Sequence, residues 1–144
     1  MAAVVLDASL VALLGVVTVS DLRTRLVPDA ALVTSLAVAL PVCLLWEPGA
    51  VPERLVAGAG AGGFLLAAAL IRPEGMGLGD VKLAGVLGIY LGTQVIEAIL
   101  VAFAAGSVAG LVLLVRHGWS ARDRTIPFAP FLAIGALAAV AAQP

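Results

Sequence analysis

The chain has 144 residues, of which 62% are hydrophobic and only 12% are charged, and its formal net charge is −1. Soluble domains are usually about 45–50% apolar and about 25% charged, so the polar residues are too few to cover a soluble globule. The sequence has no basic run that could follow phosphates, so no nucleic-acid partner is expected. The single cysteine, Cys43, excludes an internal disulfide and a cysteine-based zinc cluster. The composition therefore indicates an integral membrane protein in contact with the lipid bilayer.

Four apolar segments are long enough to span a bilayer, which takes roughly 17–25 residues per helix. They are residues 2–19, 30–46, 55–71 and 126–142. The region 81–115 would be about 52 Å long as one helix, far more than the roughly 30 Å hydrocarbon core. As two helices it must turn near Gly92-Thr93-Gln94, and the first of the two is then short.

The distribution of charge favours two helices in this region, because positive residues gather on the cytoplasmic side of membrane proteins. With two helices, only Arg54 lies on the outer side, whereas one helix would split the basic residues evenly. The sequence therefore predicts an all-α, six-transmembrane-helix bundle with both termini outside, as a single domain over residues 1–144. Cytoplasmic loops are expected around residues 21–29, 72–80 and 116–125. The basic residues expected on the cytoplasmic side are Arg23, Arg25, Arg72, Lys82, Arg116, Arg122 and Arg124.

Two aspartates stand at membrane depth on the predicted cytoplasmic side. Asp21 ends the first helix and Asp80 begins the fourth, so both lie at one depth on helices of opposite direction. An ionisable group at membrane depth is costly and is a candidate for function. Each also has a structural interpretation, Asp80 as the N-cap of its helix and Asp21 as an ion-pair partner of Arg23 or Arg25.

The other polar candidates have ordinary interpretations. Asp29, just after Pro28, is expected to be the N-cap of the second helix. Glu47 and Glu53 are expected to be solvated loop charges. His117 has no histidine or cysteine near it in the sequence, so no metal site is predicted.

Three glycines alternate before Asp80 in the stretch GMGLGDVKLAG, namely Gly75, Gly77 and Gly79. Glycine permits the close approach of another chain or unusual dihedral angles. A nucleotide-binding G-x-G-x-x-G loop is excluded, because Asp80 and Lys82 stand where it would need glycine and a membrane helix precedes it. The stretch therefore predicts a close approach beside Asp80, with a wet cavity between residues 21–29 and 75–82. Small residues four apart, in the rows beginning at 58, 84 and 106, further predict close helix packing.

Three motifs in order resemble those of the type IV prepilin peptidases. GLGD followed by VKL resembles the family's G-x-G-D-x-K-L motif. DLRTRLVPD resembles the first aspartate motif, with Asp21 followed by Val27 and Pro28. PFAPFLAIGA resembles the P-F-G-P-F-L stretch on the last helix, with Ala129 where glycine is usual. The resemblance runs from residue 21 to about 135.

This resemblance implies a membrane aspartyl endopeptidase of pilus biogenesis and protein secretion. Such an enzyme removes the basic leader of prepilin-like precursors at the cytoplasmic face of the inner membrane, and its aspartates map onto Asp21 and Asp80. The chain resembles the short form, related to preflagellin peptidases, which lacks the four-cysteine loop, so no methyltransferase activity is implied. Lys82 is expected to reach lipid headgroups or substrate rather than Asp80. The other motif residues expected near the substrate are Gly77, Gly79 and Pro28.

Two carboxylates also suit amide hydrolysis on chemical grounds. The reaction needs a base for the attacking water and an acid for the carbonyl oxygen and the leaving amine. Two carboxylates that share one proton supply both roles, and no metal or cofactor is required. Which aspartate is the acid stays open, because such a pair titrates jointly.

Two other functions stay open. A presenilin-type intramembrane protease shares only the G-x-G-D, and its first motif pairs tyrosine with aspartate, whereas Asp21 follows Ser20. A proton-coupled transporter or assembly factor would use the carboxylates as proton carriers. That function favours carboxylates near mid-membrane, and here both are expected at one edge.

Overall fold

The computed structural model describes residues 1–123 and 126–144. Over these residues the chain forms six α-helices and three short 3-10 helices. The α-helices are α1 (Ala2–Thr24), α2 (Asp29–Trp46), α3 (Val51–Ile71), α4 (Leu78–Leu91), α5 (Val95–His117) and α6 (Ala129–Ala141). The 3-10 helices are η1 (Pro48–Ala50), η2 (Gly92–Gln94) and η3 (Gly118–Asp123). The predicted all-α architecture is confirmed for this described part of the chain.

Several helical segments are apolar and long enough to cross a bilayer, which makes the chain a multi-pass membrane protein. They are Ala2–Thr24, Asp29–Trp46, Pro48–Ile71 and Leu78–Ala121, and α6 is shorter. The last long segment is broken by η2, where Gly92 has a φ of 60° that side chains rarely permit. The predicted turn between a short α4 and a longer α5 is therefore confirmed.

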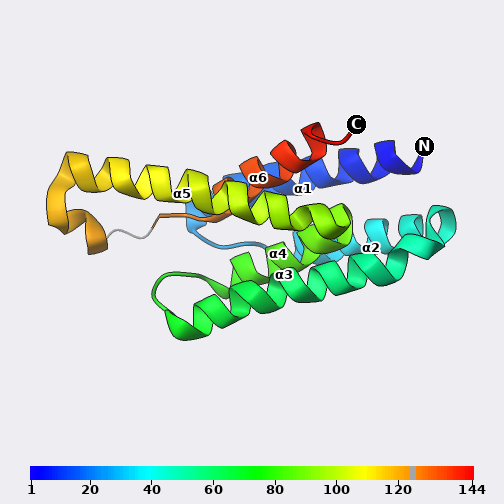
Figure 1. The fold of residues 1–144 in the computed structure, drawn as a ribbon, viewed down its shortest axis with the longest axis horizontal. Coiled ribbons are helices and arrows are strands. Elements are labelled where there is room, and N and C mark those ends of the chain that lie inside the picture. Colours follow the sequence, from blue (N-terminus) through cyan, green and yellow to red (C-terminus); the bar gives the residue numbers. More distant parts are fainter. Residues whose placement is uncertain (124–125) are drawn as a thin grey trace.

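The connections alternate between two ends of the bundle (Figure 1). The α1–α2, α3–α4 and α5–α6 connections lie at one end, here called the aspartate end because Asp21 and Asp80 lie near it. Both chain termini and the other two connections lie at the opposite end, here called the terminal end. Arg124 in the predicted loop 116–125 lies outside the described residues, as do the side chains of Arg122 and Asp123.

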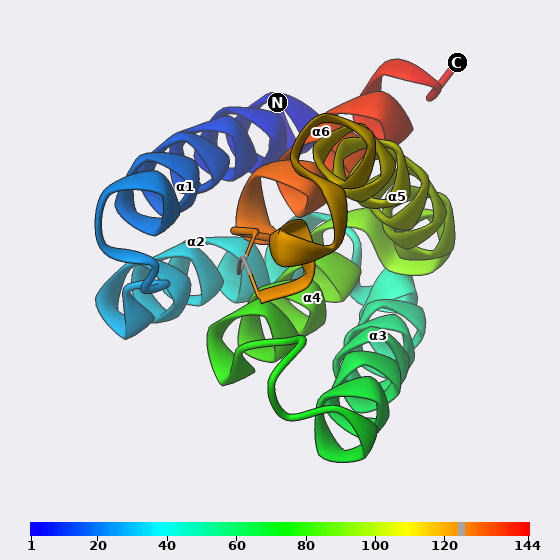
Figure 2. The same cartoon turned by 90° about the vertical axis from the view of Figure 1, so that its left-hand side faces the viewer.

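The two shortest α-helices form the centre of the bundle. Seen from the aspartate end, α4 lies between α2 and α3, and α6 lies between α1 and α5 (Figure 2). Eight of the 14 residues of α4 are buried, against six of the 23 residues of α1. The surrounding helices expose large apolar side chains, such as Phe64 and Leu100. This arrangement suits lipid, which solvates an apolar surface while packing holds the centre together.

Glycines allow α3 and α4 to pack closely. A Cβ atom added to Gly88 would lie 2.5 Å from the Cα of Gly58, closer than real side chains approach. The predicted rows of small residues that begin at positions 58 and 84 therefore do bring helices together. The row that begins at position 106 contributes less to helix packing, because a Cβ on Gly110 would meet no atom within 4 Å.

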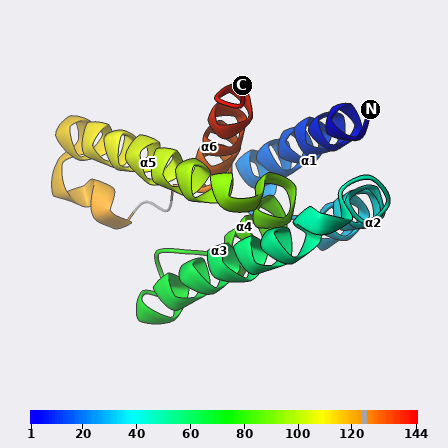
Figure 3. The same ribbon diagram turned by 45° about the vertical axis from the view of Figure 1, so that its right-hand side comes forward.

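The helices α3 and α5 diverge toward the aspartate end (Figure 3), and phenylalanine side chains of both helices contact each other. The rings of Phe64 on α3 and Phe103 on α5 pack edge to face with centroids 6.3 Å apart. Phe103 also contacts Phe128, with centroids 5.3 Å apart, and Phe128 is the N-cap of α6. These contacts fix the start of α6 against the two outer helices.

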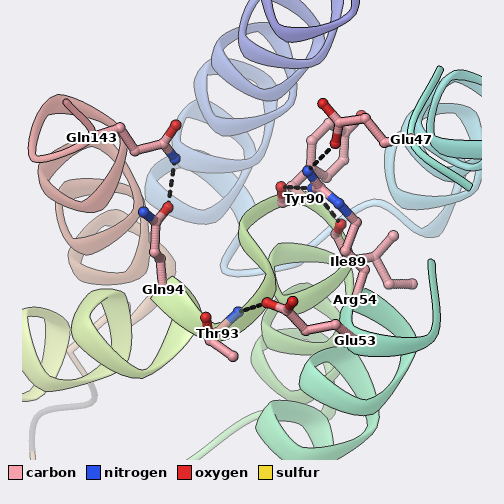
Figure 4. Close-up of polar contacts among 8 residues, drawn as sticks. All are labelled: Glu47, Glu53, Arg54, Ile89, Tyr90, Thr93, Gln94 and Gln143. Atoms are coloured by element: carbon pink, nitrogen blue, oxygen red, sulfur yellow. Dashed lines mark hydrogen bonds and ion pairs between the residues drawn. The ribbon is translucent and has the colours of Figure 1, made fainter. Parts of the chain in front are cut away.

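An arginine holds the terminal end of α4 (Figure 4). Arg54 of α3 donates hydrogen bonds to the carbonyl oxygens of Ile89 and Tyr90 and forms a 2.9 Å ion pair with Glu47. The last carbonyls of a helix lack intrahelical partners, so the guanidinium satisfies them inside the bundle. Glu47 lies between α2 and η1 as expected, but it is an ion-pair partner of Arg54 rather than only a solvated loop charge.

Two more contacts join η2 to its neighbours at this end (Figure 4). Glu53 accepts a 3.4 Å hydrogen bond from the backbone N–H of Thr93. Gln143 donates a 2.5 Å hydrogen bond to the side chain of Gln94. Glu53 lies in the first turn of α3 rather than in a loop, which corrects its predicted place. The groups around Arg54 and η2 line a polar cavity of about 300 Å³.

Candidate functional site

A second polar cavity, of about 410 Å³, lies at the aspartate end. Its walls come from the α1–α2 connection and from the start of α4. The residues that line it are Asp21, Arg25, Leu26, Val27, Asp29, Gly77, Leu78, Gly79, Asp80 and Lys82. The predicted cavity between the segments 21–29 and 75–82 is therefore confirmed.

Asp21 lies in the last turn of α1, because this helix continues to Thr24 instead of ending at Asp21 as predicted. Its side chain is 6% exposed, and its Oδ2 accepts a 3.2 Å hydrogen bond from the backbone N–H of Ala129. Ala129 is the first residue of α6, and a helix N-terminus favours a nearby negative group. Within the described residues Asp21 forms no ion pair with Arg23 or Arg25, so that interpretation is wrong.

The chain leaves α1 through a left-handed turn at Arg25, which has φ 55° and ψ 30°. This conformation is uncommon for a residue with a side chain, and here it caps the helix. The hydroxyl of Ser20 donates a 2.8 Å hydrogen bond to the carbonyl of Leu26, which folds the connection back onto α1. Pro28 is the N-cap of α2 and restricts Val27 to an extended backbone.

Asp80 lies in the first turn of α4, and Gly77 is the N-cap of that helix. The interpretation of Asp80 as an N-cap is therefore wrong. The residue is 8% exposed, and its buried Oδ1 atom has no hydrogen-bond partner in the described part of the chain. A buried polar atom without a protein partner needs a water molecule or a ligand group. The cavity beside Asp80 offers space for either.

Asp21 and Asp80 line the same cavity. One comes from the end of α1 and the other from the start of α4, as the predicted topology requires. Two carboxyl groups in one cavity can share a proton, so that one accepts a proton from water while the other donates one. Among the described residues, no group of three or more His, Cys, Asp or Glu side chains could hold a metal ion.

Gly79 is the position in the glycine stretch where a side chain has no room. A Cβ there would lie 2.9 Å from the Cβ of Val27. At Gly75 and Gly77, an added Cβ would meet no atom closer than 3.6 Å. The predicted close approach is therefore confirmed at Gly79, and the approaching chain is the protein's own α1–α2 connection.

Lys82 pairs with Asp29 rather than with Asp80. Its Nζ atom donates hydrogen bonds of 3.0 and 3.2 Å to the two carboxylate oxygens of Asp29. The expectation that Lys82 does not pair with Asp80 therefore holds, and its contact with headgroups or substrate stays a prediction. Asp29 is the first residue of α2 and makes no capping hydrogen bond, so its predicted capping role is wrong. Both side chains are more than half exposed, so the pair adds little stability.

Comparisons with known proteins agree with one another. A profile of the type IV leader peptidase family matches residues 8–115. The prepilin leader peptidase/N-methyltransferase of Burkholderia pseudomallei is 37% identical over 125 residues, which cover 82% of this chain and 40% of that protein. The proteins of the same name from Xanthomonas campestris and Bacillus subtilis are 36% and 31% identical, over 92% and 90% of this chain and 46% and 52% of their own lengths.

The chain thus spans about half the length of the curated relatives it matches, or somewhat less. No solved structure gives a significant match. The family profile covers most of the chain and includes both cavity aspartates, Asp21 and Asp80. By its sequence, this multi-pass membrane protein belongs to the type IV leader peptidase family.

Proposed function

We propose that the chain is a membrane aspartyl endopeptidase that removes the leader peptide of prepilin-like precursors, with Asp21 and Asp80 as its catalytic pair. Family membership supports the substrate class. One observation supports the catalytic pair above others: Asp80 lines the same cavity as Asp21, and its buried Oδ1 atom has no hydrogen-bond partner in the described part of the chain. A buried oxygen without a protein partner lowers the stability of the fold. A catalytic role for this oxygen explains why the protein keeps it.

The reaction needs only these two carboxyl groups and a water molecule between them. The ionised carboxylate takes a proton from the water as the water oxygen attacks the scissile carbonyl carbon. The protonated carboxyl group donates its proton to the carbonyl oxygen, which gives a neutral tetrahedral intermediate. Collapse of this intermediate breaks the C–N bond, and the amine leaves with the proton that came from the water. As the C=O bond forms again, one hydroxyl group of the intermediate returns its proton to the carboxylate that acted as the acid. The pair ends with one shared proton, ready for the next cycle.

We place the aspartate end at the cytoplasmic face of the inner membrane. Arg23, Arg25, Arg72 and Arg116 lie at or near this end, whereas Arg54 lies at the other. Positive residues gather on the cytoplasmic side, so the orientation brings the catalytic pair to the compartment where precursors are made. Both termini are then outside.

In this arrangement all six α-helices are spans. At about 1.5 Å per residue, the 14 residues of α4 and the 13 of α6 extend only about 20 Å. That is less than the roughly 30 Å hydrocarbon core. Both helices are central, so other helices cover them, and α4 ends in a polar cavity on each side. Short helices are tolerated at depth where protein or a water-filled cavity covers them.

A proton-coupled transporter is less well supported by the packing around α4. Such a protein needs a polar route between the two membrane faces. Leu83 and Leu87 lie on α4 between Asp80 and Tyr90 and are fully buried. They belong to the apolar core of the bundle.

Co-expression with candidate prepilins tests the proposal. We expect the wild-type protein to shorten at least one precursor by its leader, measured by intact mass and N-terminal sequencing. The matched control is Asp80→Asn, which should accumulate in the membrane to the same level and leave the precursor intact. Failure to process any precursor with a prepilin-type leader would reject the proposal in favour of a non-enzymatic function.

A further inference from the structure

We propose that Val27 is a positioning residue of this active site. By packing against the Cα atom of Gly79, it fixes the α1–α2 connection on the first turn of α4, and so sets the spacing between Asp21 and Asp80. This inference rests on the proposed catalytic pair and adds a residue that does not touch the reacting atoms.

The contact joins the two segments that carry the aspartates. Gly79 directly precedes Asp80, and Val27 follows Asp21 by six residues. A Cβ added to Gly79 would lie 2.9 Å from the Cβ and 3.0 Å from the Cγ2 of Val27. Side chains do not approach this closely, so any residue larger than glycine must push the two segments apart. The requirement for glycine here therefore comes from Val27.

The α1–α2 connection is held in place on both sides of Val27, so it cannot easily yield. The Ser20 hydroxyl holds the carbonyl of Leu26, and Pro28 limits the backbone of Val27 to extended conformations. Valine is itself stiff about its first side-chain torsion. A larger group at position 79 would therefore move the start of α4 rather than the connection.

Such a movement acts directly on the catalytic pair. Relieving a 2.9 Å contact to an ordinary van der Waals distance takes a shift of about 0.5–1 Å. Asp80 moves with Gly79, since both lie in the first turn of one helix, while Asp21 stays on α1. A water shared by two carboxyl groups needs each of them within about 2.6–3.2 Å, and a misplacement of about 1 Å can cost about 100-fold in rate.

A double-mutant cycle of Gly79→Ala and Val27→Gly tests this inference, since Val27→Gly removes both atoms that crowd position 79. The purified proteins are assayed on a precursor that the wild type cleaves. We expect Gly79→Ala to lower kcat by about 10- to 100-fold, with KM and melting temperature nearly unchanged. Val27→Gly should lower kcat by a smaller factor, because the connection becomes looser. The double variant should be as active as Val27→Gly alone.

The matched control is Gly62→Ala on α3, where an added Cβ would lie 3.5 Å or more from its neighbours, and it should leave kcat unchanged. If Gly79→Ala costs as much activity with glycine at position 27 as with valine, the space beside Gly79 serves the substrate and the inference is wrong. The inference is also wrong if the activity loss only follows a lower melting temperature. Full activity of folded Asp80→Asn would instead reject the catalytic pair itself.

Discussion

The two ends of α4 lie in polar cavities of different character. At the terminal end, Arg54 satisfies the last carbonyls of the helix and pairs with Glu47. At the aspartate end, a buried oxygen of Asp80 has no hydrogen-bond partner in the described part of the chain. Partnered polar groups stabilise a membrane bundle, whereas an unpartnered one weakens it and marks a place for chemistry. The comparison separates polar residues that hold this fold from those proposed to react.

The largest expected effect is a loss of stability that would disturb both ends of α4. Gly88 lies between the two cavities on α4, and a Cβ there would lie 2.5 Å from the backbone N and Cα of Gly58. We expect Gly88→Ala to lower the free energy of unfolding by about 3 kcal/mol, because backbone atoms cannot rotate aside. Melting temperature and yield of folded protein measure this effect. Gly62→Ala, which meets only ordinary contacts, is the control, and an equal loss there would assign both glycines to general packing.

Removing Arg54 sharpens the comparison at the terminal end. The Arg54 side chain is 17% exposed and bonds two carbonyls and a carboxylate. We expect Arg54→Ala to lower the free energy of unfolding by about 2 kcal/mol, because it leaves these acceptors without a charged donor. The kcat of the folded fraction should stay within about threefold of wild type, since the chemistry takes place at the other end of α4. A stable but inactive Arg54→Ala variant would contradict the distinction between polar residues that stabilise the fold and those proposed to react.

The ion pair between Lys82 and Asp29 should matter less. It lies at the aspartate end but is exposed, and exposed pairs contribute below about 1 kcal/mol. We expect Lys82→Gln and Asp29→Asn to have equal, small effects on melting temperature and cleavage rate, and the double variant to show no further loss. An activity collapse with Lys82→Gln alone would show that Lys82 contacts the substrate.

The smallest expected effect is that of a chelator. The proposed reaction uses carboxyl groups as acid and base, so dialysis against EDTA should leave the cleavage rate unchanged. The measurement compares initial rates before and after dialysis, with zinc and magnesium added back separately. A loss that either metal restores would contradict the two-carboxylate reaction.

The position of α4 could be predicted from the sequence, because the lengths of the apolar segments and the distribution of basic residues limit the number of helices. A region too long for one span and a glycine at the turn were enough to place its ends near Asp80 and Gly92, close to the observed Leu78 and Leu91. The end of α1 was predicted at Asp21, less than one turn before its observed end at Thr24, since the polar run that follows is typical of a loop. The helix continues because Asp21 is buried and finds a partner on α6.

The long-range contacts around the proposed active site could not be predicted from the sequence. Lys82 meets Asp29 across 53 positions of sequence, and Ala129 meets Asp21 across 108. The local sequence pattern around these residues does not indicate a partner so far away in the chain. The glycine stretch predicted a close approach beside Asp80, but only the packed fold identifies Val27 as the group that makes it.

The most direct test of the central claim is the cleavage rate of purified Asp21→Asn and Asp80→Asn, each measured with its melting temperature. An amide can neither take the proton from water nor supply one to the carbonyl oxygen. The account therefore predicts at least about a 100-fold loss of kcat in each variant, with the fold intact. Glu53→Gln, which changes a carboxylate of the terminal end, should keep the wild-type rate. A folded aspartate variant that retained more than a few per cent of the wild-type rate would contradict the claim that these two carboxyl groups perform the reaction.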